Sequence, residues 1–517
     1  MKNKFAKELG LLGIIGIVIK IIGSFYRVPL AYIMSEEAVS YYAIAYPWYL
    51  TLIVISTTAL PSVVSKLTAE AGALNDIKAQ YDTFIISKKL MMLFGVTTLA
   101  LLCIGAKGVT YYLGYPESFW SFVVLGVASF FVALNAAYRG LFQGTQRMRY
   151  FGYSQLVEQL GRVIFGLLTV WLFSVLAFND GLIAAAGTSG AAYGGVVSWL
   201  FALVIYHKEF KPHRARLRDH KPLIKKIIRM AVPIALGASI FPLLTIIDST
   251  MVIARLRTAG FGDEAGIMYS YLSFYGAPII GIAEAVIIAL QVSLLPMIAR
   301  SYTLKDKRLS NQIYMGIRLA MLIGLPMAFG IAGLSEPILK LLYPSKGALI
   351  ADASVVLMWL GLGVIFLAIY QATTGMLQGV GQYKKPVVNL VIGAMLKVIL
   401  GYILLGIPSI NVNGAAISTL LTYALAACLN VWALVKLHKR PAGFIANTVK
   451  IVVSNLLMLL TATQTFMWLS QRIDFRMSLL IAIGCAVAVY GILIFGLKLV
   501  SKDDFQNMEG QLVEDEE

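Results

Sequence analysis

The sequence predicts an all-α polytopic membrane protein with fourteen transmembrane helices. Of its 517 residues, 59% are hydrophobic and 13% are charged, and this charged fraction is about half that of an ordinary soluble domain. Apolar runs of about 20 residues, each long enough to cross a hydrocarbon core of ~30 Å, recur along the chain. These runs are too long and too uniformly apolar for the short alternating strands of an outer-membrane barrel.

The fourteen apolar segments follow one another with short polar connections. They are expected at 9–34, 41–66, 88–107, 118–142, 152–177, 181–206, 229–255, 267–299, 312–335, 352–378, 386–407, 413–436, 446–470 and 477–499. The first one begins like a signal peptide but continues through Lys20 and Arg27 without a small-residue cleavage site. We therefore expect it to be retained as a membrane helix.

Lys and Arg are distributed unevenly between the two sides of this arrangement. With the N-terminus inside, the loops, helix ends and tails on that side hold 31 of the 43 basic residues, and the other side holds 7. Positive residues accumulate on the cytoplasmic side of membrane proteins, so both termini are expected in the cytoplasm. The net charge of +17 then follows from topology and does not require a nucleic-acid partner. The basic connector 207–229 is expected to contact anionic membrane lipids.

Cysteine and histidine give no sign of a disulfide or a metal site. Cys103, Cys428 and Cys485 all lie inside apolar runs, and no two form a C-x-x-C pair. The four histidines lie in basic loops without ligand-like spacing. The sequence therefore predicts neither a bound metal nor a cofactor.

An internal repeat divides the chain. A constant offset of 235 residues pairs Gly140, Gln143, Gly144, Arg162, Val163, Ile164 and Gly166 with Gly375, Gln378, Gly379, Lys397, Val398, Ile399 and Gly401, and pairs Leu60-Pro61 with Leu295-Pro296. Each copy has six helices, so both copies enter the membrane from the same side, as in transporters with two parallel lobes. We expect an N-terminal lobe with its connector at 1–220, a second lobe at 221–440, and two added helices with an acidic tail at 441–517.

Several cations lie inside apolar segments, where a charge costs at least ~2.5–3.5 kcal/mol. Lys20, Arg162 and Lys397 are expected roughly 15–18 Å from the cytoplasmic helix ends, near the middle of the bilayer, and Arg27 lies closer to the outer end. Buried charges usually face a wet interior. We therefore expect these four cations to line a cavity between the lobes that holds a phosphate or pyrophosphate group.

Simpler explanations exist for most of these charges. Glu158 and Arg162 are four residues apart on one helix and could neutralise each other, although Glu158 could also contact substrate. Lys20 could have a structural role, and Arg27 could anchor the helix at the outer interface. Lys397 has no acidic residue three or four positions away, which makes it the least easily explained.

Two other features are typical of helices that bend and pack closely. Prolines interrupt the apolar segments at Pro47, Pro61, Pro233, Pro278, Pro296 and Pro326, where they free backbone carbonyls. Gly190 and Gly194 form a face of small residues within "AAAGTSGAAYGG".

The stretches "KIIGSFYRVPLA", "ALPSVVSKLTAE", "YRGLFQG", "SQLVEQLGRV" and "MLQGVGQYKKPVVNLVIGAMLK" resemble the stage V sporulation protein B branch of bacterial polysaccharide exporters. This branch shares a superfamily with MurJ-like lipid II flippases and multidrug-and-toxin extruders. The resemblance covers essentially the whole chain. It implies a flippase in the bacterial cytoplasmic membrane that moves an undecaprenyl-pyrophosphate-linked saccharide, with lipid II as the leading substrate.

The resemblance also implies site residues, with some departures. Lys20, before Gly23, and Arg27 match the two cavity arginines of the first helix, but a lysine lacks the bidentate fork of arginine. The family's basic pair past Pro47 is replaced by "WYLTLIV", Ser273 stands near another expected arginine, and the family's acid at the start of the second helix has no clean match. These departures put the identity of the lipid in doubt.

Some relatives bind sodium in the second lobe, and Asp248 and Asn389 are the matching candidates here. Coupling to Na⁺, to H⁺ or to the membrane potential stays open.

Four other functions were weighed. The chain could flip a different lipid-linked polysaccharide repeat unit. A cation-coupled multidrug antiporter of the same fold would need acids along its cavity, whereas buried cations are at least as numerous here. An enzyme acting on the same lipid would need carboxylates or a histidine on a substantial outer loop, and the expected outer loops are short, so no enzymatic activity is expected. A role beside the cell-wall synthesis machinery remains open.

Overall fold

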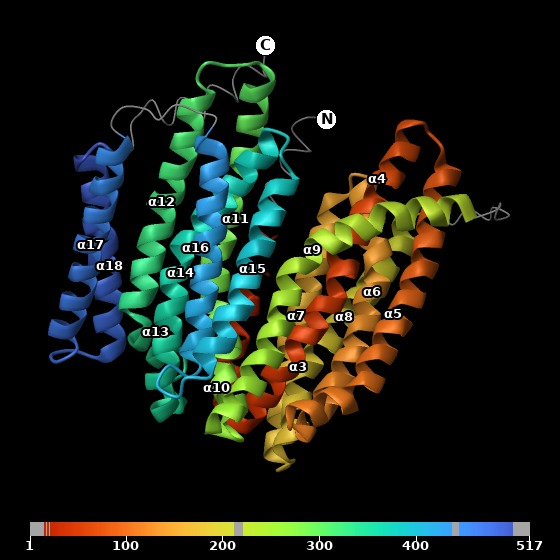
Figure 1. Ribbon diagram of the computed structural model, residues 1–517. Helices are drawn as coiled ribbons and strands as arrows, with labels where there is room; N and C mark the ends of the chain where they lie inside the picture. Colours follow the sequence, from red (N-terminus) through yellow and green to blue (C-terminus); the bar gives the residue numbers. More distant parts are fainter. Residues whose placement is uncertain (1–14, 17, 20, 211–220, 437–443, 500–517) are drawn as a thin grey trace. The chain divides into compact units, whose positions relative to one another are not determined.

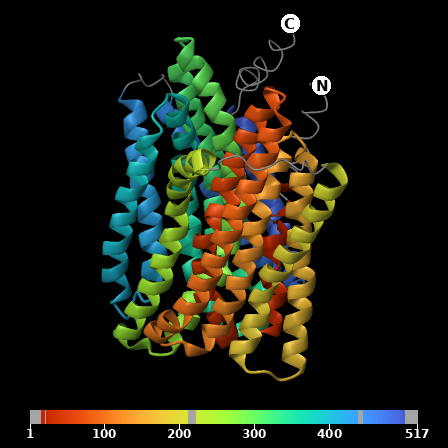
Figure 2. The same ribbon diagram turned by 90° about the vertical axis from the view of Figure 1, so that its right-hand side faces the viewer.

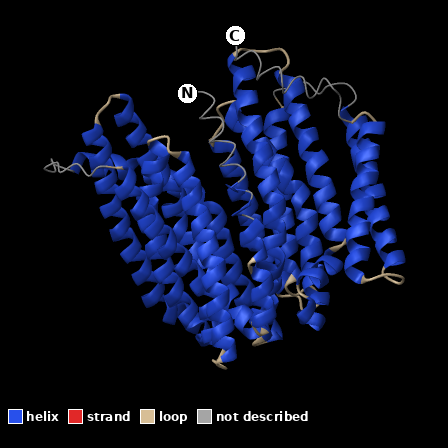
Figure 3. Cartoon of the chain, turned by 180° about the vertical axis from the view of Figure 1, so that it is seen from behind, coloured by secondary structure: helices blue, strands red, loops and turns tan. Residues whose placement is uncertain are grey.

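A computed structural model describes residues 15–16, 18–19, 21–210, 221–436 and 444–499. Within these ranges every regular element is helical and no strand occurs (Figure 3). Twelve of the described helices are long and apolar enough to cross a membrane, or thirteen if the bent pair Lys221–Ser239 and Pro242–Phe261 forms one span. The predicted all-α membrane fold is therefore confirmed. Its first segment, 9–34, is described only in part, so the count of fourteen stays a prediction.

The helices keep the order expected from the sequence. Those of 3₁₀ or π type are labelled η. They are α2 (Arg27–Ile33), α3 (Glu36–Val54), η1 (Ile55–Ala59), α4 (Leu60–Ala73), α5 (Ile77–Leu113), η2 (Pro116–Ser118), α6 (Phe119–Gly144), α7 (Met148–Val175), α8 (Asp180–Glu209), α9 (Lys221–Leu256), η3 (Arg257–Phe261), α10 (Glu264–Ser270), η4 (Tyr271–Gly276), α11 (Ala277–Thr303), α12 (Leu309–Gly333), α13 (Ser335–Leu342), η5 (Pro344–Lys346), α14 (Gly347–Gly379), α15 (Lys384–Leu405), α16 (Asn413–Val435), α17 (Phe444–Leu469) and α18 (Phe475–Gly496).

The chain forms two compact units. The first holds Met1–Ile282 and Gly401–Val412, and the second holds Ala283–Leu400 and Asn413–Glu517. In the first unit α7 packs along α8, and α6 packs against α4, α5 and α8 (Figures 1 and 2). In the second unit α14 lies between α12 and α16, while α17 and α18 pair beside α12. The lobes predicted at 1–220, 221–440 and 441–517 stay a prediction.

Several helix ends in the first unit are set by local sequence. The side chains of Ser35, Asp76 and Asn179 accept hydrogen bonds from the backbone N–H three residues later, at the starts of α3, α5 and α8. Such caps satisfy amides that have no partner inside the helix. Helix α5 ends at Gly114, whose φ of 77° suits the left-handed position that glycine adopts readily.

The repeated glycines bring helices into backbone contact in both units. In the first unit, a Cβ on Gly144 of α6 would lie 2.6 Å from the carbonyl oxygen of Ser65 on α4. In the second, a Cβ on Gly379 of α14 would lie 2.9 Å from the carbonyl oxygen of Leu295 on α11. The G-x-x-Q-G motif therefore serves close helix packing in each copy, against the helix that carries the Leu-Pro pair.

Two prolines follow widened helical turns. The π segment η1 ends one residue before Leu60-Pro61, and η4 ends two residues before Pro278. Proline has no N–H to donate and its ring clashes with the carbonyl of the fourth residue before it. The turn ahead of each proline therefore opens, and carbonyl oxygens there become available to other donors.

Candidate functional site

Glu158 and Arg162 lie one turn apart on α7, pressed against α8. A Cβ on Gly190 would lie 2.6 Å from the carbonyl oxygen of Arg162, and Gly194 is equally close to the carbonyl of Glu158. Only glycines permit this approach, so the small-residue face predicted in "AAAGTSGAAYGG" holds the two charged residues at a fixed distance from α8.

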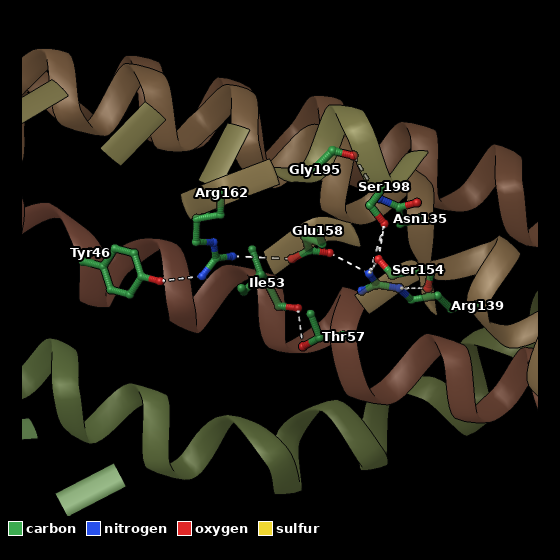
Figure 4. Close-up of polar contacts among 10 residues, drawn as sticks. All are labelled: Tyr46, Ile53, Thr57, Asn135, Arg139, Ser154, Glu158, Arg162, Gly195 and Ser198. Atoms are coloured by element: carbon green, nitrogen blue, oxygen red, sulfur yellow. Dashed lines mark hydrogen bonds and ion pairs between the residues drawn. The ribbon is translucent and has the colours of Figure 1, made fainter. Parts of the chain in front are cut away.

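Glu158 binds Arg139 more closely than it binds Arg162 (Figure 4). Its Oε2 lies 2.6 Å from Nη2 of Arg139, whereas its Oε1 lies 3.5 Å from Nη2 of Arg162. Arg139 is 6% exposed and sits inside α6. The sequence analysis had counted it among the cytoplasmic helix ends, which was wrong. Its position five residues before the end of an apolar run was the signal that could have identified it.

Arg162 has donor capacity that its neighbours do not use. Its Nη1 donates to the Tyr46 hydroxyl at 3.2 Å, and its contact with Glu158 is at the limit of a hydrogen bond. In the described part of the chain, its buried Nε has no acceptor. Mutual neutralisation with Glu158 therefore does not account for Arg162, because the carboxylate is matched mainly by Arg139.

Arg27 lies against the same tyrosine. Its Cζ is 5.7 Å from the ring centroid of Tyr46 and 5.7 Å from that of Phe274. Its Nη1 donates to the carbonyl oxygens of Ser273 at 2.5 Å and Phe274 at 3.4 Å. Phe274 is the fourth residue before Pro278, so its carbonyl is one that proline leaves without a helical partner. Arg27 thus satisfies carbonyls in η4.

The tyrosines of α3 hold these two arginines near each other. The ring of Tyr42 stacks on that of Tyr46 at 5.2 Å between centroids, and the ring of Tyr49 lies 5.7 Å from it. The spacing of tyrosines in "YYAIAYPWY" puts all three on one helix face. We call Arg27, Tyr46 and Arg162 the Tyr46 cluster. It offers two guanidinium groups, which suit an anion with several oxygen atoms.

The structure does not gather all of the predicted residues. Lys20 lies outside the described residues. Lys397 is 4% exposed on α15 in the second unit, and Asp248 is 8% exposed on α9 in the first. Asn389 of α15 donates from Nδ2 to Oδ1 of Asn430 at 2.8 Å. The gathering of four cations between lobes and the ion site of Asp248 and Asn389 remain predictions. Among the described residues, no group of three or more His, Cys, Asp or Glu could hold a metal.

Two family models match the sequence. The one described as "Polysaccharide biosynthesis protein" matches residues 5–302, and the one described as "MatE" matches residues 233–403. The first covers more than half of the chain.

Individual relatives are similar over most of their length. "Lipid II flippase MurJ" of Bacillus subtilis (strain 168) is 25% identical over 462 residues, which are 85% of this chain and 84% of that protein. "Stage V sporulation protein B" of the same organism is 22% identical over 523 residues, 98% of each chain. The solved structure "Lipid II flippase MurJ, inward closed conformation" superposes with a TM-score of 0.71 at 17% identity, covering 95% of this chain and 100% of that one. The resemblance inferred from the motifs is confirmed.

Proposed function

From the premise that the chain belongs to the polysaccharide biosynthesis protein family, we propose that it is a flippase for an undecaprenyl-pyrophosphate-linked saccharide. The chain is a multi-pass membrane protein. Lipid II, named for the MurJ relative, is the substrate proposed first, and another lipid-linked polysaccharide repeat unit is proposed second. The lipid would cross the bacterial cytoplasmic membrane by alternating access, without covalent chemistry.

The Tyr46 cluster is the observation that supports this proposal. Arg27 and Arg162 both contact Tyr46, and the nearby acid, Glu158, is already bound by Arg139. The cluster therefore carries net positive charge among membrane helices. A buried site of this kind selects anions, and a pyrophosphate offers the several oxygens that two guanidinium groups can bind.

Three further features belong to the proposal. Both termini would lie in the cytoplasm, because of the bias in basic residues. Transport would be driven by Na⁺, by H⁺ or by the membrane potential. The protein would act beside the cell-wall synthesis machinery that consumes the flipped lipid, and the basic connector would contact anionic lipids.

A complementation assay tests the proposal. The protein would be expressed in a bacterium depleted of its own lipid II flippase, and exposure of lipid II on the outer leaflet would be measured. Arg27→Ala and Arg162→Ala would be compared at equal membrane abundance with Arg472→Ala, a matched control in the exposed turn after α17.

We expect the wild type and Arg472→Ala to restore lipid II exposure and the two cluster variants to fail. No rescue by an abundant, correctly inserted wild type would point to the second substrate class. Rescue by every variant would show that the cluster does not bind the headgroup.

A second candidate function is a cation-coupled multidrug antiporter of the same fold, which the MatE match at residues 233–403 favours. Efflux of ethidium from cells expressing the protein would distinguish the two. An antiporter would lower ethidium accumulation without restoring lipid II exposure.

A further inference from the structure

We propose that Arg139 is a positioning residue that makes Arg162 available to a phosphate group, by holding the carboxylate of Glu158 away from it. The inference rests on the proposed function, because it assumes an anionic headgroup at Arg162. Three charges, Arg139, Glu158 and Arg162, lie in one row, with the acid in the middle (Figure 4).

The two contacts of Glu158 are unequal. Charge-assisted N–H···O bonds between ions are typically about 2.7–2.9 Å long. The contact with Arg139 is 2.6 Å and the contact with Arg162 is 3.5 Å. The carboxylate is therefore bound by Arg139 and only touched by Arg162.

Arg139 is itself held in place by α7 and α8. Its Nε donates to Oγ of Ser154 at 3.0 Å, and its Nη2 donates to the carbonyl oxygen of Ser154 at 3.2 Å and to Oγ of Ser198 at 3.2 Å. The hydroxyl of Ser198 in turn donates to the carbonyl oxygen of Ser154 at 2.8 Å. The side chain is 7% exposed. Within the described ranges, Glu158 is the one acid in an ion pair with it.

Arg162 is the more accessible and less satisfied cation. Its side chain is 16% exposed, its Nη1 has only the neutral hydroxyl of Tyr46 at 3.2 Å, and its Nε has no acceptor among the described residues. A buried donor without an acceptor is unfavourable, and the low dielectric of such a site strengthens any ionic bond that satisfies it. A phosphate could accept from Nε and Nη2 together, as guanidinium groups bind phosphate in a bidentate manner.

A phosphate would then replace the weak contact of Glu158 with Arg162, while Glu158 stays on Arg139. Without Arg139, the carboxylate would be left with Arg162, its neighbour one turn away on α7. That pair would be neutral and would repel an approaching phosphate. The defect should therefore disappear when Glu158 also loses its charge.

The test measures binding of undecaprenyl pyrophosphate to the purified full-length protein in detergent, with uncharged undecaprenol as the control ligand. We expect Arg139→Gln to weaken binding by about tenfold or more. Arg139→Lys should retain part of the affinity, and Glu158→Gln should bind more tightly than wild type. The double variant Arg139→Gln, Glu158→Gln should recover to within about threefold of wild type. Binding of undecaprenol should not change in any variant.

A structural role for Arg139 predicts the opposite pattern, because removing both partners takes more of the network away. A double variant as weak as Arg139→Gln would overturn the proposal. If Arg139→Gln does not fold, Glu158→Gln alone decides, since weaker binding than wild type would also overturn it. Arg162→Ala separates the two claims. If it binds undecaprenyl pyrophosphate normally, the proposed anion site fails. If it loses binding while Arg139→Gln keeps it, only the role of Arg139 fails.

Discussion

Gly375 packs directly against the carbonyl oxygen of Gln291, which would lie 2.5 Å from a Cβ at that position. Its repeat counterpart, Gly140, packs against Pro61, whose carbonyl oxygen would lie 3.0 Å from a Cβ. The offset of 235 residues pairs Pro61 with Pro296, not with Gln291. The two copies of the motif therefore use different helix registers, five residues or roughly 7.5 Å apart.

Because both contacts reach the backbone, alanine should not be tolerated at either glycine. We expect Gly140→Ala and Gly375→Ala to lower the free energy of unfolding by about 1–3 kcal/mol, the usual range for overpacking. Thermal unfolding of the purified protein, followed by intrinsic fluorescence, would measure this. The matched control is Gly330→Ala in α12, where a Cβ would meet no atom within 4 Å. Equal melting temperatures for Gly375→Ala and Gly330→Ala would contradict the close packing.

Arg27 should stabilise the first unit by satisfying carbonyl oxygens that Pro278 leaves free. Arg27→Ala would leave the carbonyls of Ser273 and Phe274 without this donor, which should lower the free energy of unfolding by about 1–3 kcal/mol. Adding Pro278→Ala should restore part of that loss, because a regular helix can satisfy the carbonyl of Phe274 itself. Thermal unfolding of the single and double variants would show this. No recovery in the double variant would mean that Arg27 acts elsewhere.

Tyr46 should contribute to substrate binding through its hydroxyl and its ring separately. Tyr46→Phe removes the acceptor of Arg162 and keeps the contacts with Tyr42 and Arg27, so the loss should be about 0.5–1.5 kcal/mol, the value of one hydrogen bond. Tyr46→Ala also removes the ring and should bind more weakly than Tyr46→Phe. Affinity for undecaprenyl pyrophosphate would be measured for both. Equal affinities for the two variants would show that the ring contributes nothing.

Tyr115 should make the stability of the first unit dependent on pH at alkaline values. Its hydroxyl donates to the carbonyl oxygen of Asp263 at 2.9 Å and accepts from the N–H of Gly266 at 2.6 Å. Burial raises the pKa of Tyr115 above its ordinary value of 10.0. A raised folded-state pKa means that the stabilisation is complete below pH 10 and is lost as the pH rises through the folded pKa.

Melting temperatures at pH 9 and pH 11 would test this, with Tyr115→Phe as the reference. The wild type should lose more stability than Tyr115→Phe between these two values, because phenylalanine cannot ionise. An equal loss in both proteins would show that Tyr115 does not titrate in this interval.

Much of the fold could be predicted from the sequence because hydrophobic length and charge bias act locally. A run of about 20 apolar residues forms a helix in a membrane whatever its neighbours are. The limits of α5 show where this reasoning stops. The predicted segment was 88–107, whereas the helix is Ile77–Leu113, because its cap Asp76 and its terminal Gly114 lie in polar sequence beyond the apolar run.

The site could be predicted only in part. The sequence by itself determined that Arg27, Glu158 and Arg162 lie within apolar helices, and that Glu158 and Arg162 share a helix face, since residues four apart are neighbours on any α-helix. Only the tertiary structure decided that Glu158 pairs with Arg139, 19 residues away, that Arg162 meets Tyr46 across 116 residues, and that Arg27 reaches Ser273 across 246. Helical periodicity states which face a residue occupies, but the packing of separate helices selects its partner, and that selection depends on close contacts such as Gly190 and Gly194 against α7.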